Sequence, residues 1–266
     1  ATLAVAPHRL IDIRDPLDAY SAADFLADAR REMEDIHRGG RIPLLVGGSM
    51  MYFKILLDGL SQMPEADRDI RQDIEQRAAE FGWPSLYREL QQIDPQTAAR
   101  LHPNHSQRIQ RALEVHRITG VPMSVLQAKP MVGGLHDVFQ IQQFSLMPNN
   151  RALLHQRIEQ RFHSMMAQGF AAEVQGLYQR GDLNSDLPAI RSAGYRQLWD
   201  YCAGSCSLED AVERGIIATR QLAKRQITWL RNWPEAIEIA VDDGDHYYSA
   251  EYIYNQCLKK LIDVPI

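Results

Sequence analysis

The chain has 266 residues, of which 45% are hydrophobic and 24% are charged, a balance that excludes a fibre and a disordered tail. Lys and Arg number 29 against 34 Asp and Glu, which gives a formal net charge of −5. Residues 232–266 hold seven acids and two lysines, so this tail carries the whole excess. Any site for a polyanion must therefore come from local clusters of Arg and Lys.

The cysteines and the apolar runs indicate in which cellular compartment the protein works. Cys202, Cys206 and Cys257 form no zinc-ligand pattern, which favours a reducing environment. No apolar run approaches the roughly 18 residues of a membrane-spanning helix, and no signal peptide opens the sequence. We expect a cytoplasmic protein that contacts no membrane. Because the sequence begins at Ala1 and soon enters an apolar segment, we also expect a further piece ahead of it.

The first elements predict an α/β fold. Residues 8–13 have the pattern of a strand, and Ser21 is a good N-cap for a helix that reaches about residue 37. The apolar run 42–46 is typical of a strand buried in a parallel sheet. Strand, helix and strand in this order predict a βαβ unit.

A glycine-rich turn follows this unit. Gly47, Gly48 and Ser49 precede a helix predicted over about 50–57, so they would lie at the carboxyl edge of the sheet, where ligands bind in open α/β folds. Glycines there let the backbone approach a phosphate, and the free N–H groups of the next helix favour an anion. A tight turn capped by Ser49 explains the same residues without a ligand.

From about residue 63 the chain is rich in Gln, Arg and Glu, with no strand-like run until 138–146, which predicts a helical insertion. Its helices are expected at 67–81, 84–93 and 106–119, the last capped by Ser106 and stopped by Gly120, with a linker at 131–136. After the returning strand, helices are expected at 151–168, 170–180, 187–202 and 208–232, the last capped by Ser207.

The predicted fold class is thus α/β, a parallel sheet core with an all-helical insertion. Its parts are residues 1–62 (first part of the core), 63–132 (helical insertion), 133–233 (return to the core and C-terminal helices) and 234–266 (acidic tail).

The predicted helix 208–232 carries the strongest cluster of cations. Arg220, Lys224 and Arg231 fall within about 40° of one another around a helix, which makes one cationic stripe. No acid lies between Arg214 and Trp233, while Leu222 and Trp229 are expected to anchor the opposite face. Either an anion or acids from elsewhere, such as the tail, must meet this stripe, and the pattern leaves both open.

Three further groups are candidates for binding phosphates or bases. They are the run Gln107, Arg108, Ile109, Gln110 and Arg111, the run Arg191, Ser192, Ala193, Gly194, Tyr195 and Arg196, and the pair Arg157 and Arg161. Ordinary solvated helix surfaces also carry such residues. His102 and His105 lie beside a Pro-Asn turn and are interpreted as loop residues, not as a metal pair.

Several motifs together resemble the tRNA dimethylallyltransferase family, and their order agrees over residues 7–233. They are Pro7-His8-Arg9-Leu10-Ile11-Asp12, the helix start Tyr20-Ser21-Ala22, Pro43-Leu44-Leu45-Val46-Gly47-Gly48-Ser49, Gln107-Arg108-Ile109-Gln110-Arg111-Ala112-Leu113-Glu114, Arg191-Ser192-Ala193-Gly194-Tyr195-Arg196-Gln197 and Lys224-Arg225-Gln226-Ile227-Thr228-Trp229-Leu230-Arg231. The resemblance implies an enzyme that moves a dimethylallyl group from dimethylallyl diphosphate to N6 of adenosine 37 in tRNA. It also implies a core like that of P-loop nucleotide kinases and an insertion that grips the anticodon stem-loop.

By this resemblance Ser49 lies near the adenosine and Arg161 is the catalytic arginine that faces the diphosphate. The implied tRNA contacts are Arg71, Gln107, Arg108, Ile109, Gln110, Arg111, Arg191, Ser192, Ala193, Gly194, Tyr195, Arg196, Lys224, Arg225, Gln226, Ile227, Thr228, Trp229, Leu230 and Arg231. The family's phosphate-binding loop and general-base aspartate have no counterpart in this sequence and are expected ahead of Ala1, together with a Mg²⁺ site. We expect a monomer.

Two alternatives stay open at this stage. A nucleotide kinase of related core would need a P-loop but has little use for an insertion that carries Arg108 and Arg111. A non-catalytic RNA-binding remnant would explain why the sequence contains no Gly-x4-Gly-Lys-Ser/Thr loop.

Overall fold

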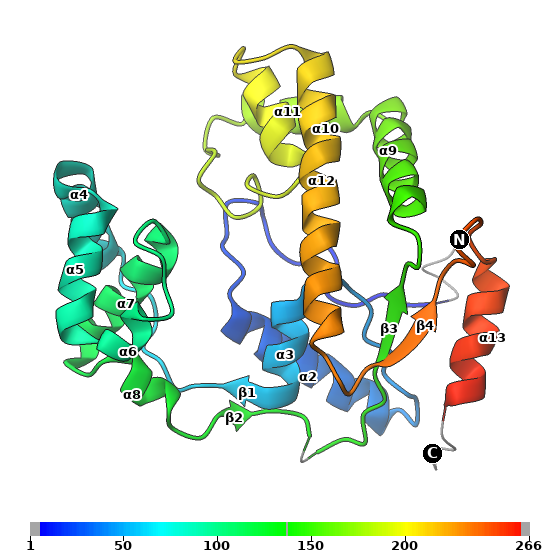
Figure 1. Ribbon diagram of the computed structural model, residues 1–266, viewed down its shortest axis with the longest axis horizontal. Coiled ribbons are helices and arrows are strands. Elements are labelled where there is room, and N and C mark those ends of the chain that lie inside the picture. Colours follow the sequence, from blue (N-terminus) through cyan, green and yellow to red (C-terminus); the bar gives the residue numbers. More distant parts are fainter. Residues whose placement is uncertain (1–5, 137, 262–266) are drawn as a thin grey trace. The chain divides into compact units, whose positions relative to one another are not determined.

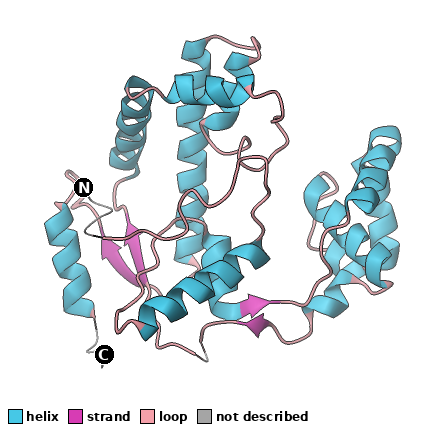
Figure 2. Cartoon of the chain, turned by 180° about the vertical axis from the view of Figure 1, so that it is seen from behind, coloured by secondary structure: helices cyan, strands magenta, loops and turns pink. Residues whose placement is uncertain are grey.

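The computed structural model describes residues 6–136 and 138–261, and the chain forms two compact units. One unit comprises residues 1–53 and 139–266, and the other comprises residues 54–138. Helices make up most of both units, with short strands between them (Figures 1 and 2). No helix in the described ranges is long and apolar enough to cross a membrane.

The first unit contains most of the helices that carry candidate residues. Its elements are α2 (Ala22–Arg38), α3 (Met50–Asp58, which continues into the second unit), β3 (Phe144–Met147), α9 (Arg151–Ala167), α10 (Phe170–Gln179), α11 (Tyr195–Cys202), α12 (Leu208–Arg231), β4 (Ile237–Ala240) and α13 (Ala250–Lys260).

The second unit holds a bundle of short helices. Its elements are β1 (Gly59–Leu60), α4 (Arg68–Phe81), α5 (Trp83–Ile93), α6 (Pro95–Ala98), α7 (Ser106–Thr119), α8 (Met123–Gln127) and β2 (Val132–Gly133). Helices α4, α5 and α7 pack together around Ile74, Leu90 and Leu113, whose side chains are fully buried. The predicted linker 131–136 contains β2, which pairs with β1 in antiparallel fashion.

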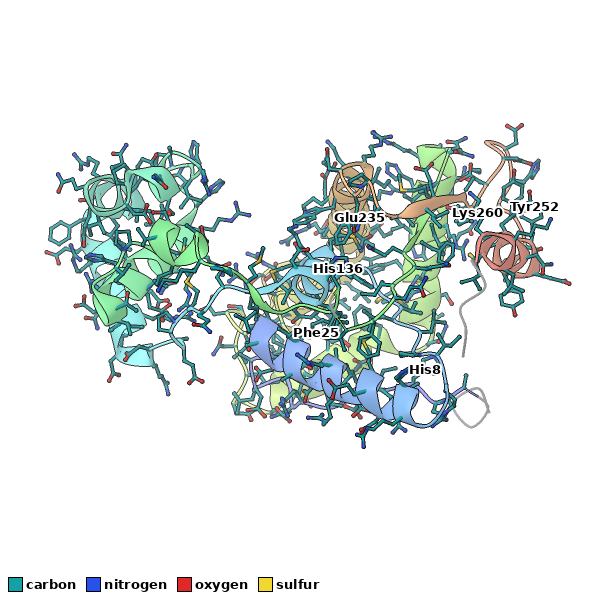
Figure 3. The ribbon with its side chains drawn as sticks, turned by 90° about the horizontal axis from the view of Figure 1, so that it is seen from below. His8, Phe25, His136, Glu235, Tyr252 and Lys260 are labelled. Atoms are coloured by element: carbon teal, nitrogen blue, oxygen red, sulfur yellow. The ribbon has the colours of Figure 1, made fainter. Side chains whose placement is uncertain are left out.

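In the described part of the first unit, β3 and β4 lie side by side as a two-stranded parallel sheet. Its register pairs Leu146 with Ile239, and Ile239 is buried. Helix α13 lies beside β4 in Figure 3, and Lys260 Nζ at its end donates to the Glu238 carbonyl at 3.2 Å. The strand β4 comes from the acidic tail, in which the sequence showed no motif.

The strands predicted at 8–13 and 42–46 are wrong, and so is the βαβ unit built from them. Neither segment is a strand, and the described residues provide no backbone hydrogen-bond partner for 42–46. Ile42, Leu44 and Val46 are 66%, 86% and 83% exposed. An apolar run marks a tendency to form a strand, but the strand itself requires a neighbour to bond with.

The predicted helix ends are mostly confirmed, because they rest on local capping chemistry. Ser21 accepts from the Asp24 N–H at 3.1 Å and Asp24 accepts from the Ser21 N–H at 2.9 Å, a full capping box. Helix α7 spans 106–119 as predicted, with Gly120 left-handed at its end. Ser106, however, is the first residue of α7 and its side chain caps nothing.

The helix predicted over 187–202 begins only at Tyr195. Residues 187–194 form turns, and Gly194 immediately before α11 has φ 94°. A right-handed helix cannot continue through that conformation, which glycine adopts at little cost. The Gly194 N–H donates to the Gln197 side chain at 2.8 Å, so the turn is closed locally.

The core of the first unit lies among α9, α10, α11 and α12. Phe162 of α9 packs edge-on against Phe170 of α10, with ring centroids 6.1 Å apart. On the other side its ring meets Gly215 of α12, where an added Cβ would lie 2.4 Å from the ring. The two helices therefore pack more closely than any other residue at position 215 would allow.

We predict that Gly215→Ala destabilises the protein by about 1–3 kcal/mol, because the methyl group must displace the Phe162 ring. Gly176→Ala in α10 is the matched control, since an added Cβ meets nothing within 4 Å there, and it should stabilise by up to about 1 kcal/mol. Urea unfolding of both variants measures this. Equal effects of the two substitutions would contradict the packing described.

Candidate functional site

Helix α12 presents exposed cations along its last turns. Lys224, Arg225 and Arg231 are exposed, and the described residues include no ion-pair partner for them. For Arg220 the second of the two possibilities left open by the sequence holds, because it pairs with an acid from elsewhere in the chain, Glu159 of α9, at 2.7 Å. Glu159 lies 61 residues away in sequence, which is why local spacing did not reveal the pair. The surface available for an anion is therefore the end of α12.

Leu222 and Trp229 do not anchor α12, contrary to the sequence-based prediction. They are 39% and 44% exposed, whereas Ile227 is buried and Leu230 is half-buried. Arg225 lies one turn from Trp229 on the same face of the helix. The end of α12 thus offers an aromatic ring and cations together, a combination that suits stacking on bases and pairing with phosphates.

The glycine turn before α3 contacts α12 directly. Gln226 Nε2 donates to the Gly48 carbonyl at 2.9 Å, and a Cβ on Gly48 would lie 2.4 Å from that nitrogen. Gly48 therefore permits the close approach of the amide. This contact joins two segments that the sequence had flagged separately, the turn that includes Ser49 and the Lys224–Arg231 segment.

The run 191–196 is divided between core and surface. Arg191 and Arg196 are exposed, whereas the Tyr195 ring packs edge-on against Phe170 at 5.0 Å. The Tyr195 hydroxyl donates to Glu173. Burial, together with the Glu173 carboxylate, raises the pKa of Tyr195 to about 12. Tyr195 is thus already engaged by the protein.

The remaining residues of this run serve the turn. The Ser192 hydroxyl donates to the Ala189 carbonyl at 2.7 Å, Ala193 is half-buried and Gly194 is buried. The two arginines are therefore its accessible cations.

Helix α9 carries Arg157 and Arg161 one turn apart, both exposed. The Arg157 guanidinium lies over the Tyr247 ring, 4.6 Å from the centroid. Leu153, Gln156, Arg157, Gln160 and Tyr247 line a shallow hollow of about 300 Å³ beside it. The polar groups in this hollow are guanidinium, amide and hydroxyl, and none is an acid. The described partners leave both arginines available for an anion.

In the second unit a buried acid, Glu114, holds two of the predicted arginines, Arg71 and Arg111. Glu114 of α7 has a fully buried side chain and accepts two bonds from Arg71, at 2.8 and 3.2 Å. Arg111 donates to the same carboxylate at 2.7 Å and to the Pro64 carbonyl at 2.7 Å. The Asp67 N–H donates to it at 2.9 Å. Glu114 is the last residue of the motif 107–114, but its spacing in the sequence did not reveal that it binds Arg71 and Arg111.

The pKa of Glu114 is lowered from its ordinary value. Burial by itself raises it, but the hydrogen bonds from Arg71, from Arg111 and from the Asp67 N–H outweigh that cost. The carboxylate is therefore ionised at neutral pH, and it orients the two guanidinium groups that it binds.

The other predicted residues of α7 differ in accessibility. Gln107 and Arg108 are exposed. Gln110 donates to Glu75 at 2.8 Å, and Ile109 is fully buried in the core. The Ile109 side chain cannot touch a ligand, so its contribution is to packing.

The described residues contain no group of three or more His, Cys, Asp or Glu that could hold a metal ion. His102 and His105 lie in the loop before α7, as interpreted from sequence, with ring centroids 5.8 Å apart.

Comparison with known proteins relates the chain to one family. A model of that family, described as IPP transferase, matches residues 1–233. The chain is similar to the full-length tRNA isopentenylpyrophosphate transferase from Bacillus halodurans, with 32% identity and a TM-score of 0.62. The match covers 94% of this chain and 76% of that one.

Two further solved structures are similar. The tRNA isopentenylpyrophosphate transferase from Staphylococcus epidermidis has 27% identity and a TM-score of 0.58, over 96% of this chain and 81% of that one. A eukaryotic dimethylallyltransferase acting on tRNA has 23% identity and a TM-score of 0.68, over 94% of this chain and 65% of that one. The last likeness concerns the fold alone.

We predict that Glu114→Gln lowers the free energy of unfolding of the second unit by about 1–3 kcal/mol at pH 7. Arg71 and Arg111 lose the carboxylate that they bind, but both guanidinium groups still reach water. Because the folded-state pKa of Glu114 is lowered, its stabilisation is complete above the unfolded pKa of about 4.3 and disappears as pH falls through the folded pKa. Urea unfolding from pH 7 to pH 3 should show a shallower acid loss in the variant.

Glu89→Gln is the matched control, because Glu89 pairs with Arg77 at the surface and should contribute at most about 1 kcal/mol. If Glu114→Gln has the stability and acid profile of the unsubstituted protein, the role given to Glu114 is wrong.

Proposed function

This chain belongs to the IPP transferase family, and on that premise we propose that it is a tRNA prenyltransferase that moves a dimethylallyl group from dimethylallyl diphosphate to N6 of adenosine 37. The family match over residues 1–233 supports a transferase over a nucleotide kinase or a non-catalytic remnant. The finer parts of the proposal, the donor and the modified base, rest on the motif resemblance and on the chemistry below.

The reaction requires charge neutralisation more than it requires a strong base. The N6 nitrogen bonds to C1 of the dimethylallyl group, the C1–O bond to diphosphate breaks, and N6 releases one proton. Negative charge grows on the departing diphosphate, so cations aimed at it lower the barrier. We assign that role to Arg161 of α9, which is exposed and has no ion-pair partner among the described residues.

The structural observation that supports the placement of the adenosine is the hydrogen bond from Gln226 to the Gly48 carbonyl. It ties the turn that holds Ser49 to the part of α12 that bears Lys224, Arg225 and Arg231. A small hydroxyl residue beside cations and an exposed Trp229 suits an adenosine whose neighbouring phosphates are bound by the helix. We propose that Ser49 lies near the adenosine and that the cations contact tRNA backbone.

Adenosine 37 must leave the stack of its loop before it can react, which costs a few kcal/mol. Phosphate contacts elsewhere on the tRNA can supply that energy. We propose that Arg108, Gln107 and the oriented pair Arg71 and Arg111 of the second unit contact the anticodon stem-loop, and that Arg191 and Arg196 contribute from the first unit.

We propose three further properties that the resemblance implies. They are a core related to P-loop nucleotide kinases, a Mg²⁺ ion that accompanies the diphosphate, and a monomer acting in the cytoplasm. The phosphate-binding loop and the general base are assigned to no residue of this sequence.

We predict that Lys224→Ala and Arg231→Ala each weaken tRNA binding and each reduce the slope of log K against log salt by roughly one, because each removes a phosphate contact. Arg180→Ala is the matched control, since Arg180 is outside the surfaces assigned to tRNA, is paired with Asp15 and Asp182 at 2.8 Å, and should leave the slope unchanged. Filter binding at several salt concentrations measures the slopes. Equal slopes in all variants would refute the assigned surface.

We predict that Arg161→Ala in the intact protein lowers kcat for prenyl transfer by at least about tenfold while the Kd for tRNA changes by less than about twofold. The physical reason is that a cation facing the diphosphate acts on the leaving group and not on the RNA. Steady-state assays and tRNA binding measured on the same preparation test this. Parallel losses of both quantities would show that Arg161 contacts RNA instead.

A further inference from the structure

The turn 241–248 holds the start of α9 through one buried carboxylate. Asp242 has 0% exposure, and its carboxylate accepts from the backbone N–H groups of Asn149, Asn150 and Gly244 at 3.0, 3.1 and 3.0 Å. Asn149 Nδ2 donates to the Asp242 carbonyl at 2.7 Å. The junction between β3 and α9 is therefore bonded to the residues that follow β4.

The residue that caps α9, Asn150, also bonds to the turn 241–248. Asn150 Oδ1 accepts from the Ala152 N–H at 2.8 Å, which is the N-cap bond, and Asn150 Nδ2 donates to the Gly244 carbonyl at 2.6 Å. The axis and rotation of α9 at its first residue are thus fixed by contacts to the turn. Everything that α9 carries, including Arg157 and Arg161, takes its direction from that point.

The turn also holds one of the arginines. Tyr247 lies under the Arg157 guanidinium at 4.6 Å, and the two residues opposite each other in the turn, Asp242 and Tyr247, form a β-bridge. The Tyr247 hydroxyl is buried and bonds to none of the described residues. The contact that the geometry establishes is the guanidinium over the face of the ring. An arginine stacked on a ring has fewer conformations to lose when it binds an anion.

We propose that the turn 241–248, which lies beyond the family match over residues 1–233, is a positioning element for diphosphate binding: Asp242 orients α9 and Tyr247 holds the Arg157 guanidinium beside Arg161. This inference rests on the proposed function, because it assumes that the arginines of α9 face the diphosphate. Tyr247 and Asp242 act through α9 and contact no substrate atom themselves.

The test compares Tyr247→Leu, Tyr247→Phe and Arg157→Ala in the intact protein. Tyr247→Leu should raise the KM for dimethylallyl diphosphate, and the Kd for inorganic diphosphate measured by calorimetry, about two- to fivefold, the range that an exposed cation–π contact supports. The KM for tRNA should stay unchanged. Tyr247→Phe keeps the ring and should restore both values. In the Arg157→Ala background, Tyr247→Leu should have no further effect.

Tyr254→Leu is the matched control, because Tyr254 is a 60% exposed tyrosine of α13 and should change none of these constants. An unchanged diphosphate Kd in Tyr247→Leu, an equal rise in the KM for tRNA, or a Tyr247→Phe protein as weak as Tyr247→Leu would overturn the proposal. Because Arg157 is exposed, the Arg157→Ala protein should fold normally. An unchanged Kd for inorganic diphosphate in that variant would also overturn the proposal.

Should the unsubstituted protein transfer no prenyl group, the proposed function fails. The calorimetric measurement with inorganic diphosphate still decides the positioning role, since it requires no turnover. The two failures are therefore distinguishable.

Discussion

The contact between the Phe162 ring and Gly215 determines how the two arginine-bearing helices of the first unit pack. A side chain at position 215 would meet the ring at 2.4 Å, so α9 and α12 approach closely only because a glycine is there. With Phe162 turned inward, its neighbour Arg161 is turned toward solvent. The same packing leaves the last turns of α12, with Lys224, exposed. This contact in the core thus fixes how closely α9 and α12 pack, while the turn 241–248 holds the start of α9.

Pairing with acids divides the cations into two kinds. Arg71, Arg111 and Arg220 are bonded to carboxylates, and these pairs fix the shape of the surfaces that they belong to. Lys224 and Arg231 have no such partner among the described residues, so their charge is available to a phosphate chain. The near-neutral charge of residues 1–231 hides this arrangement, because affinity for RNA depends on where the unpaired cations gather.

Sequence reasoning could find the helices and the cationic segments, because caps, glycine stops and charge spacing are local. It could not find β4, whose partner β3 lies about 90 residues away, nor the pairing of Arg220 with Glu159. It failed where an apolar run lacked a neighbour, as at 42–46, and at Trp229, where helix periodicity implied an anchor that the packing does not use. The hydrogen bond from Gln226 to the turn before α3 is also a tertiary fact that no spacing reveals.

The central claim is tested most directly by identifying the reaction product. Unmodified tRNA would be incubated with the intact protein and isotope-labelled dimethylallyl diphosphate, digested to nucleosides and fragments, and analysed by mass spectrometry. The account predicts one labelled N6-dimethylallyl adenosine per tRNA, at position 37, with release of diphosphate. Label in free nucleotides, label at another position, or tRNA that is bound but never labelled would contradict it.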